Sequence, residues 1–280
     1  MELRHSLVLL SYGTGESTLK NLSQFFGTTA LLTASILFSG CGASNPTHSE
    51  EKIYGGTKVP AGQWPGTVAI TSFLGMHCSG TAITPRIVIT AGHCAGASIG
   101  STYVYVGEGA IFGLVKGQYK ATRVVASPLY AQAEEGWNDI AYILLDKPLD
   151  LPASAYIPVL TDEDEMKELL AVGATSHLVG FGNREDGGTG KKYEVDAKIN
   201  SVNDNEVNIG GDGIDSCQGD SGGPAYGQLA NGEWRVYGVV SRGGACGTGG
   251  LYGRMNANIC WIQENSGQDL GLPKGYCDKT

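Results

Sequence analysis

The chain has 280 residues, of which 41% are hydrophobic and 17% charged, and its formal net charge is −9 at pH 7. This length and apolar content allow a sizeable buried core, in one large domain or two small ones. The negative charge argues against a nucleic-acid partner, which would need a basic face. The 43 glycines separate short runs rich in Val, Ile, Thr and Tyr, a pattern typical of short strands joined by tight turns.

The N-terminal segment, residues 1–41, has the features of an export signal. Residues 25–40 are apolar or small and uncharged, and Lys20 lies just before them. The stretch is too short to span a membrane comfortably. Its end, Leu-Phe-Ser-Gly-Cys at residues 37–41, resembles a bacterial lipobox, in which the cysteine is lipidated and becomes the new N-terminus. Lipidation of Cys41, ordinary signal cleavage and an uncleaved anchor remain open, and we favour the first. The expected location is therefore secreted or lipid-anchored at the bacterial cell envelope.

Residues 42–52 are rich in Ser, Asn, Pro, Thr, His and Glu, which predicts a flexible linker or short pro-segment. Residues 53–280 form the remaining, globular part. Its six cysteines suggest three disulfides and an oxidising compartment, while Cys41 stands apart. The chain has no CxxC pair, so we expect no metal site.

The first candidate for chemistry is a histidine that follows a predicted strand. The apolar run at residues 87–89 leads into a turn that carries His93 directly before a cysteine. Such a setting would hold an imidazole firmly. His77 also adjoins a cysteine, but on the strand side, and His177 precedes the strand-like pair at 178–179. We therefore expect His93 to be the general base.

Asp139 leads into the apolar stretch at residues 140–145. A carboxylate that enters a buried strand without a partner is costly. An acid of this kind can orient an imidazole and stabilise its protonated form. The alternative is a structural strand cap.

Ser221 lies in a glycine-rich segment, Asp-Ser-Cys-Gln-Gly-Asp-Ser-Gly-Gly-Pro at residues 215–224. A Ser hydroxyl becomes a nucleophile when a base removes its proton. Glycines allow sharp turns, so that N–H groups can converge and stabilise the negative oxygen of an attacked acyl group. The segment also fits the GxSxG elbow of α/β-hydrolases, but that fold needs a His after its Ser. The last histidine of this chain is His177, which excludes that interpretation.

From Ile53 to about Ile262 the sequence resembles the trypsin/chymotrypsin family. The resemblance implies an all-β fold of two six-stranded antiparallel β-barrels with a C-terminal helix and the active site between the barrels. It implies that His93 is the general base, Asp139 its orienter and Ser221 the nucleophile. The motifs that carry it are Ile53-Tyr54-Gly55-Gly56, Thr90-Ala91-Gly92-His93-Cys94, Asn138-Asp139-Ile140-Ala141, Gly180-Phe181-Gly182 and residues 215–224.

The resemblance also implies the oxyanion hole and the route of activation. The N–H groups of Gly219 and Ser221 would bind the oxyanion. Cleavage between Lys52 and Ile53 would free an α-amino group that pairs with Asp220, and this ion pair can order the site. We therefore expect the protein to be made as a zymogen that is inactive until it is cut at this bond. If Cys41 is lipidated, the same cut would release the protease from its membrane.

The specificity pocket follows from the same resemblance. Asp215 would form its floor and select Lys or Arg side chains by charge, with a further contact from Ser216. Gly243 and Gly250 match the pocket walls, and Ser241 with Gly243 matches the strand that binds the substrate backbone. Arg242 departs from the family, which usually has Trp at this position.

For the six cysteines of the globular part, the resemblance implies two disulfides and elimination gives the third. The family implies Cys78 with Cys94 and Cys217 with Cys246, and this leaves Cys260 to pair with Cys277. Residues 258–265 are the expected final helix. We expect neither a cofactor nor bound calcium. The expected partners are protein or peptide substrates and proteinaceous inhibitors, and the expected oligomeric state is a monomer. The competing hypotheses are a catalytically silent binding protein of the same fold and an esterase without protease activity.

Overall fold

The computed structural model describes residues 53–73, 75–96, 101–110, 114–130, 137–184 and 187–279. The predictions for the signal at 1–41, for Cys41, for the linker at 42–52 and for Lys52 lie outside these ranges. No helix within the described ranges is long and apolar enough to cross a membrane.

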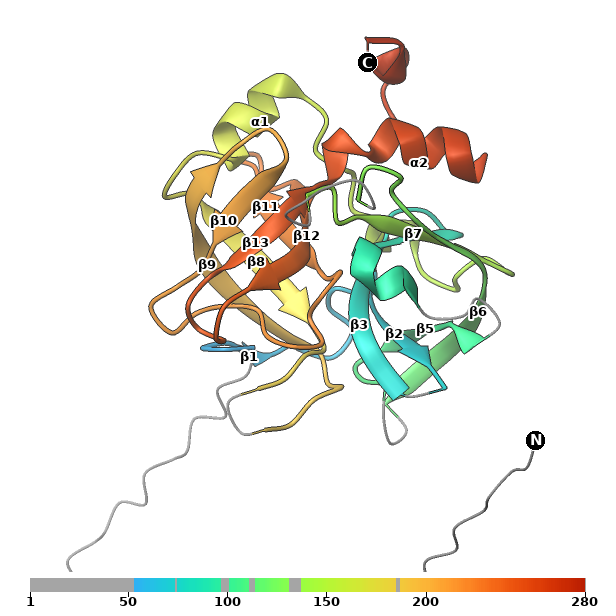
Figure 1. Ribbon diagram of the computed structural model, residues 1–280, viewed down its shortest axis with the longest axis horizontal. Coiled ribbons are helices and arrows are strands. Elements are labelled where there is room, and N and C mark those ends of the chain that lie inside the picture. Colours follow the sequence, from blue (N-terminus) through green and yellow to red (C-terminus); the bar gives the residue numbers. More distant parts are fainter. Residues whose placement is uncertain are drawn as a thin grey trace, which may run out of the picture. The chain divides into compact units, whose positions relative to one another are not determined.

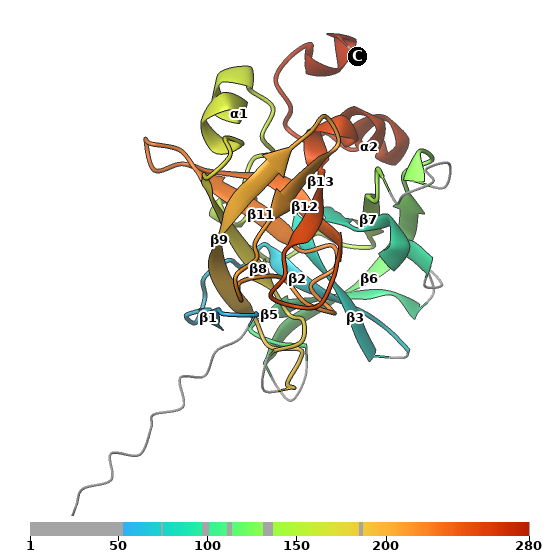
Figure 2. The same ribbon diagram turned by 60° about the vertical axis from the view of Figure 1, so that its left-hand side comes forward.

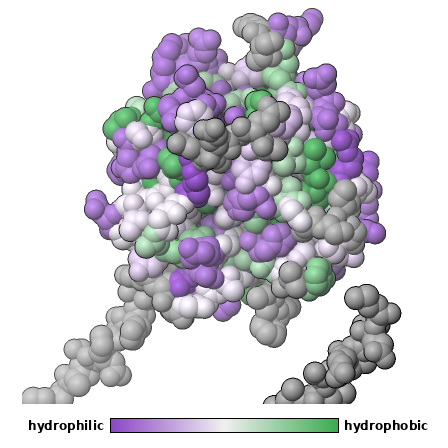
Figure 3. Space-filling model, viewed as in Figure 1, coloured by the Kyte–Doolittle hydropathy of each residue, from purple (hydrophilic) through white to green (hydrophobic). Residues whose placement is uncertain are grey.

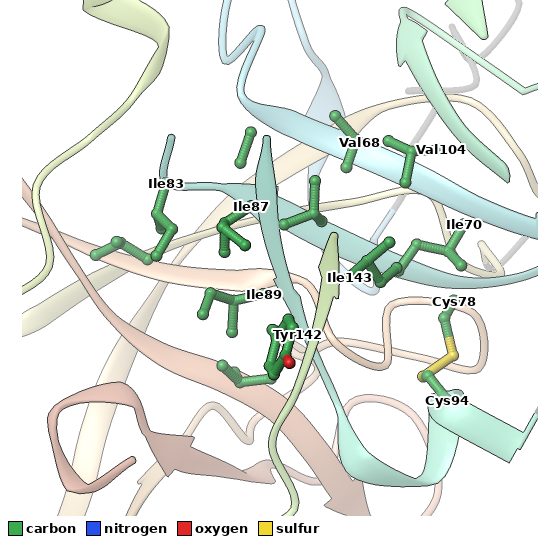
Figure 4. Packing of buried hydrophobic residues seen from close by; sticks show 14 of the residues in the cluster. Val68, Ile70, Cys78, Ile83, Ile87, Ile89, Cys94, Val104, Tyr142 and Ile143 are labelled. Carbon is green, nitrogen blue, oxygen red and sulfur yellow. A yellow bond between two sulfur atoms is a disulfide. The ribbon is translucent and has the colours of Figure 1, made fainter. Parts of the chain in front are cut away.

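Six strands of the first half of the domain close into an antiparallel barrel. Their spatial order is β2-β3-β4-β7-β6-β5. Apolar side chains of these strands meet inside the barrel, as Figure 4 shows for Val68, Ile87 and Ile143. The strand bounds are β2 Thr67–Ser72, β3 Gly75–Ala82, β4 Ile87–Thr90, β5 Tyr103–Gly107, β6 Val115–Ala126 and β7 Ala141–Leu145.

Six strands of the C-terminal half form a second barrel. Strand β8 pairs with both β9 and β11, and this closes the ring β8-β9-β10-β13-β12-β11. The short strand β1 (Thr57–Lys58) adds to β9 outside the ring. Figure 1 shows the two barrels side by side. The strand bounds are β8 Thr175–Gly180, β9 Tyr193–Val202, β10 Glu206–Ile209, β11 Pro224–Gln228, β12 Trp234–Gly243 and β13 Gly250–Arg254.

Two α-helices lie at one end of the barrels, as Figures 1 and 2 both show. Helix α1 (Glu163–Leu169) begins at Asp162, whose Oδ1 accepts N–H groups of the first turn at 2.9 and 3.0 Å. Helix α2 (Ile259–Ser266) ends at Gly267, whose φ of 65° suits glycine. The final helix was expected at 258–265, one residue earlier. The short 3₁₀ helices are η1 Gly92–Gly96, η4 Ala153–Ala155, η5 Met255–Ala257 and η6 Tyr276–Lys279.

The prediction of two six-stranded antiparallel barrels with a C-terminal helix is confirmed. The structure also contains three disulfides: Cys78–Cys94, Cys217–Cys246 and Cys260–Cys277. Closing loops of this size stabilises the fold by about 3 kcal/mol each in chain-entropy terms. Disulfides persist in oxidising surroundings, so they indicate an extracellular setting. The face in Figure 3 is mostly hydrophilic or neutral, with hydrophobic residues in small separate groups.

Candidate active site

The central pair of the site is His93 and Asp139. His93 lies on η1, directly after β4, and Asp139 lies just before β7, the strand that pairs with β4. The ring Nδ1 of His93 donates to Asp139 Oδ2 at 2.8 Å, and the backbone N–H of His93 donates to Oδ1 at 2.8 Å. Asp139 is buried, whereas 37% of the His93 side chain is exposed. The acid is therefore fixed inside the protein and the ring can reach a ligand.

The chain around Asp139 is built to hold this carboxylate. Asn138 has a φ of 57°, a left-handed conformation that Asn tolerates better than most residues. Its side-chain oxygen accepts a hydrogen bond from Asn258 at 3.2 Å. The hydroxyl of Ser241 donates to Asp139 Oδ2 at 2.7 Å. The sequence placed Ser241 on the substrate-binding strand and did not suggest this second contact.

Gly92 leaves room for an aromatic ring and an acid beside the turn that carries His93. A Cβ at residue 92 would lie 2.8 Å from the ring of Tyr130 and 3.0 Å from Asp139 Oδ1. These distances are shorter than ordinary van der Waals contacts, so glycine lets the aromatic ring and the acid pack against the turn that carries His93.

Ser221 lies where its loop packs against the first barrel. Its carbonyl oxygen accepts the N–H of Ser79, on β3, at 2.8 Å, and lies 3.8 Å from the sulfur of Cys94, the neighbour of His93. Gly222 follows with a φ of 82°, and a Cβ there would lie 2.1 Å from Thr90 Oγ1. Only glycine allows this close approach.

Ser221 and His93 thus come from different barrels to one place. The structure describes both side chains and shows no hydrogen bond between Ser221 Oγ and the His93 ring. Catalytic hydrogen bonds are often long until substrate binds. Of the three predicted triad residues, the histidine and the acid are joined directly, and the serine is brought beside them through its loop.

Two N–H groups of the Ser221 segment have no acceptor among the described residues. Among the described residues, neither the Gly219 N–H nor the Ser221 N–H donates a hydrogen bond to another group. The peptide between Gln218 and Gly219 is held from its other side, because Gln218 O accepts the Asn183 N–H at 2.7 Å. In a trans peptide the N–H points opposite to the C=O, so the Gly219 N–H is directed away from Asn183. Such free donors can bind an oxyanion.

The comparisons with known proteins agree with this geometry. A family model described as Trypsin matches residues 53–262, which include both barrels and the motifs around His93, Asp139 and Ser221.

The chain belongs to the trypsin family of serine proteases.

Three relatives of the chain cover most of its length. Phenoloxidase-activating factor 3 of Holotrichia diomphalia is 29% identical over 261 residues, 76% of this chain and 72% of the relative. Chymotrypsin-C of Mus musculus is 27% identical over 268 residues, 85% of this chain and 98% of the relative. Serine proteinase stubble of Drosophila melanogaster is 29% identical over 269 residues, 83% of this chain but 33% of the relative.

In this trypsin-family chain, Asp215 is a buried acid. Its Oδ1 accepts the N–H of Ser216 at 2.7 Å, and its Oδ2 accepts the N–H of Gly249 at 2.9 Å. Burial raises the pKa of Asp215 above its ordinary value, and these N–H groups partly offset the rise. No Lys or Arg side chain of the described residues forms an ion pair with it. A Cβ at Gly250 would lie 3.3 Å from Oδ1, so glycine leaves the space over the carboxylate open.

Ser216 and Gly243 are two further predicted pocket residues near this acid. The Ser216 hydroxyl accepts a hydrogen bond from Tyr252 Oη at 2.9 Å. Gly243 packs against the backbone of Gly249 and Gly250. Arg242 is not free, because its guanidinium forms a two-pronged ion pair with the buried Glu206, with Nη2 3.1 Å from Oε2.

Asp220 is a second buried acid, with 2% of its surface exposed. It accepts the N–H of Gly182 at 2.7 Å and the N–H of Cys217 at 2.9 Å. Burial raises its pKa to about 7 despite these donors. No side-chain cation of the described residues pairs with it. Gly180 and Gly182 are needed beside it, since a Cβ at either residue would lie within 2.6 Å of its carboxyl group.

Ile53 begins the described chain in an unusual conformation. Its side chain is buried in the core of the second barrel, yet its φ is 42°. A β-branched residue rarely adopts the left-handed region, so this position is strained. The next residue, Tyr54, is bound to the segment that carries Asp215, because Asp215 N donates to Tyr54 O at 3.1 Å.

One group of metal-ligating residue types lies within the described ranges, and it adjoins the active site. It consists of His93, Cys78 and Cys94. Both cysteines are joined to each other in a disulfide and have no thiolate to offer, whereas a thiolate is what binds a metal. The group is therefore explained by the fold.

Proposed function

We propose that the chain is a secreted trypsin-like serine endopeptidase, made as a zymogen, that cleaves peptide bonds after Lys and Arg. The observation that carries the proposal is the arrangement around Ser221. The double contact between His93 and Asp139 lies beside the Ser221 loop, and two unused N–H groups flank the nucleophile.

The reaction starts at Ser221. Its Oγ adds to the carbonyl carbon of the scissile peptide bond while its proton moves to Nε2 of His93. His93 Nδ1–H remains bonded to Asp139, which stabilises the imidazolium. The carbonyl oxygen takes the negative charge and is bound by the Gly219 and Ser221 N–H groups.

The intermediate then collapses to an acyl-enzyme, which water hydrolyses. The C–N bond breaks as the proton on His93 passes to the leaving amine, and the acyl group stays on Ser221. Water then attacks the acyl-enzyme, its proton passes to His93, and the acid product leaves as Ser221 Oγ regains that proton.

Selection of Lys and Arg rests on Asp215. A buried carboxylate with no cation beside it is costly, and a substrate cation that enters the pocket offsets that cost. The hydroxyl of Ser216 lies beside the carboxylate and can contact a Lys head group. The pair of Arg242 and Glu206 gives the neighbouring surface a polar character where the family has an aromatic side chain, so preferences beyond the primary pocket should differ from those of relatives with Trp.

Activation rests on Asp220 and Ile53. In the uncut chain no side-chain cation of the described residues pairs with the buried Asp220, and Ile53 is strained. Cleavage after Lys52 would remove the peptide bond that defines the φ of Ile53 and create an α-amino group. Pairing of that group with Asp220 would satisfy the buried carboxylate. Lys52 itself fits the proposed specificity, so the enzyme's own activity could make this cut.

Export rests on residues 1–41 and on the three disulfides. A lipid on Cys41 would anchor the precursor, and the cut after Lys52 would then release the protease. Mass spectrometry of the mature protein tests this directly. The proposal expects Ile53 at the N-terminus of soluble active enzyme, and active enzyme with this N-terminus still embedded in membrane would overturn the release step.

The experiment that tests the function compares cut and uncut chains on matched peptides. Peptide anilides that end in Arg, Lys or Phe are given to the Lys52→Gln chain and to the chain cut after Lys52. The proposal expects hydrolysis of the Arg and Lys peptides by the cut chain alone, and none by cut Ser221→Ala. A cut wild-type chain without hydrolysis would favour the silent binding protein, and ester hydrolysis without protein cleavage would favour the esterase.

A further inference from the structure

A buried hydroxyl lies where the two barrels meet behind the active site. Ser79, on β3, is 0% exposed. Its N–H donates to the carbonyl oxygen of Ser221 at 2.8 Å, and its own carbonyl accepts the hydroxyl of Thr90 at 2.9 Å. The backbone of Ser79 is therefore fixed, and its side chain is held at a defined place against the nucleophile loop.

The hydroxyl of Ser79 bonds to two segments of the second barrel. It accepts the N–H of Phe181 at 3.1 Å and donates to the carbonyl oxygen of Gly219 at 3.0 Å. A hydroxyl has one hydrogen, and this hydrogen is directed to Gly219 O because that carbonyl can only accept. No motif of the sequence singles out Ser79.

Gly219 needs such an anchor. Its φ is 95°, and a glycine in this region has few steric limits on its rotation. The peptide before it is held by the bond from Asn183 N–H to Gln218 O, at 2.7 Å. The peptide after it is held by Ser79. With both carbonyls fixed, the Gly219 N–H keeps one direction.

We propose that Ser79 is a positioning residue for the oxyanion hole, and that its hydroxyl holds Gly219 in the conformation that presents its N–H to the substrate oxygen. This inference rests on the proposed function, in which Gly219 N–H binds the oxyanion. Ser79 itself does not touch substrate.

The test is the Ser79→Ala variant of the enzyme cut after Lys52, assayed with two ligands. One is a peptide aldehyde that ends in Arg: Ser221 Oγ adds to its carbonyl carbon, the Ser221 proton moves to His93, and the carbonyl oxygen becomes an oxyanion. The other is benzamidine, a cation that enters the specificity pocket and has no oxygen. A Ser79→Gly variant lacks the same hydroxyl and is measured in parallel.

We expect kcat and aldehyde affinity to fall about 10-fold in both variants, less than the 10²–10³ that loss of a direct donor costs. KM and benzamidine affinity should stay within about twofold of wild type. Thr67→Val is the matched control, since it removes a buried hydroxyl that bonds to Tyr226 Oη at 3.0 Å, away from the nucleophile loop. It should change neither ligand's affinity.

Wild-type aldehyde affinity in both Ser79 variants would overturn the inference. A parallel loss of aldehyde and benzamidine affinity would overturn it as well, because that pattern indicates a general structural role. An inactive wild-type enzyme would instead overturn the proposed function, and the oxyanion role of Gly219 with it.

Discussion

Asp139 is joined to His93 twice, with one carboxylate oxygen on the backbone N–H and the other on the ring Nδ1, both at 2.8 Å. The first contact fixes the turn that carries His93, and the second fixes the rotation and tautomer of its ring. The ring Nε2 is thereby left free to accept a proton, so this relationship turns a half-exposed histidine into a candidate base.

Asp139→Asn should remove the base while keeping the shape of the site. An amide N–H would donate to Nδ1, which leaves the proton on Nε2 and blocks proton uptake from Ser221. We expect kcat to fall about 10⁴-fold, measured with an Arg anilide on the cut chain. Asp146→Asn, at an exposed acid, is the control and should keep full activity. A loss below about 10-fold would contradict the assigned role of Asp139.

Asp215→Ser should abolish the preference for basic residues. Removing one partner of a desolvated ion pair costs about 3–5 kcal/mol, which corresponds to a fall of roughly 10²- to 5 × 10³-fold in kcat/KM for Arg and Lys substrates. The measurement compares Arg and Phe anilides. The exposed Asp204 provides the control variant, Asp204→Ser. If the rates with Arg substrates do not change in Asp215→Ser, the pocket lies elsewhere.

Asp220 should make the uncut precursor less stable as pH rises. Its pKa of about 7 in the fold lies above the value of about 3.9 for an unfolded Asp. Between these values the folded chain binds more protons than the unfolded chain, so the stability is full below about pH 4 and is lost as pH rises through 7. From pH 5 to 8 the loss should be about 3 kcal/mol.

Urea unfolding of the Lys52→Gln chain at both pH values measures this loss. Adding Asp220→Asn should remove this loss, since the amide does not titrate. Adding Asp212→Asn, at an exposed acid of the same segment, should not. Equal pH dependence with and without Asp220→Asn would show that the acid is not buried unpaired in the precursor.

Lys192 should make the chain more stable as pH rises above 7. It is buried just before β9, with its Nζ donating to Trp64 O at 2.7 Å, and burial lowers its pKa to about 7. Between pH 7 and about 10.5 the unfolded chain binds more protons, so stability should rise by up to about 1.4 kcal/mol per pH unit. Lys192→Met should remove this rise and the exposed neighbour Lys191→Met should not, as measured by urea unfolding at pH 7 and 9. The same slope in both variants would contradict the assignment.

Much of the fold and site could be predicted because short sequence motifs mark the residues involved. A turn that carries His93, an acid entering a strand and a glycine-rich serine segment each signal their role nearby in the chain. The resemblance to the trypsin family implied two of the three disulfides, and this left Cys260 to pair with Cys277.

The missed features depend on contacts between distant segments. Ser79 lies 140 residues from Gly219, and nothing near it in the sequence marks its hydroxyl. Arg242 on β12 pairs with Glu206 on β10, another strand of the same barrel. The sequence analysis also did not predict helix α1, which Asp162 caps at the start of an acidic stretch. His177 was placed before a strand but lies within β8, where its ring lies 4.7 Å from that of Trp64, centroid to centroid, and bonds to Asp196 at 2.7 Å.

The most direct test of the central claim is covalent labelling by a phosphonate ester of an Arg analogue, which reacts with a serine only when a base and an oxyanion site act on it. The chain cut after Lys52 is incubated with this reagent and then examined by peptide mass spectrometry. We predict one adduct per chain, on Ser221, and none in the uncut Lys52→Gln or cut Asp139→Asn proteins. An unlabelled Ser221 in correctly cut wild-type enzyme would contradict the proposal that His93, Asp139 and Ser221 act together.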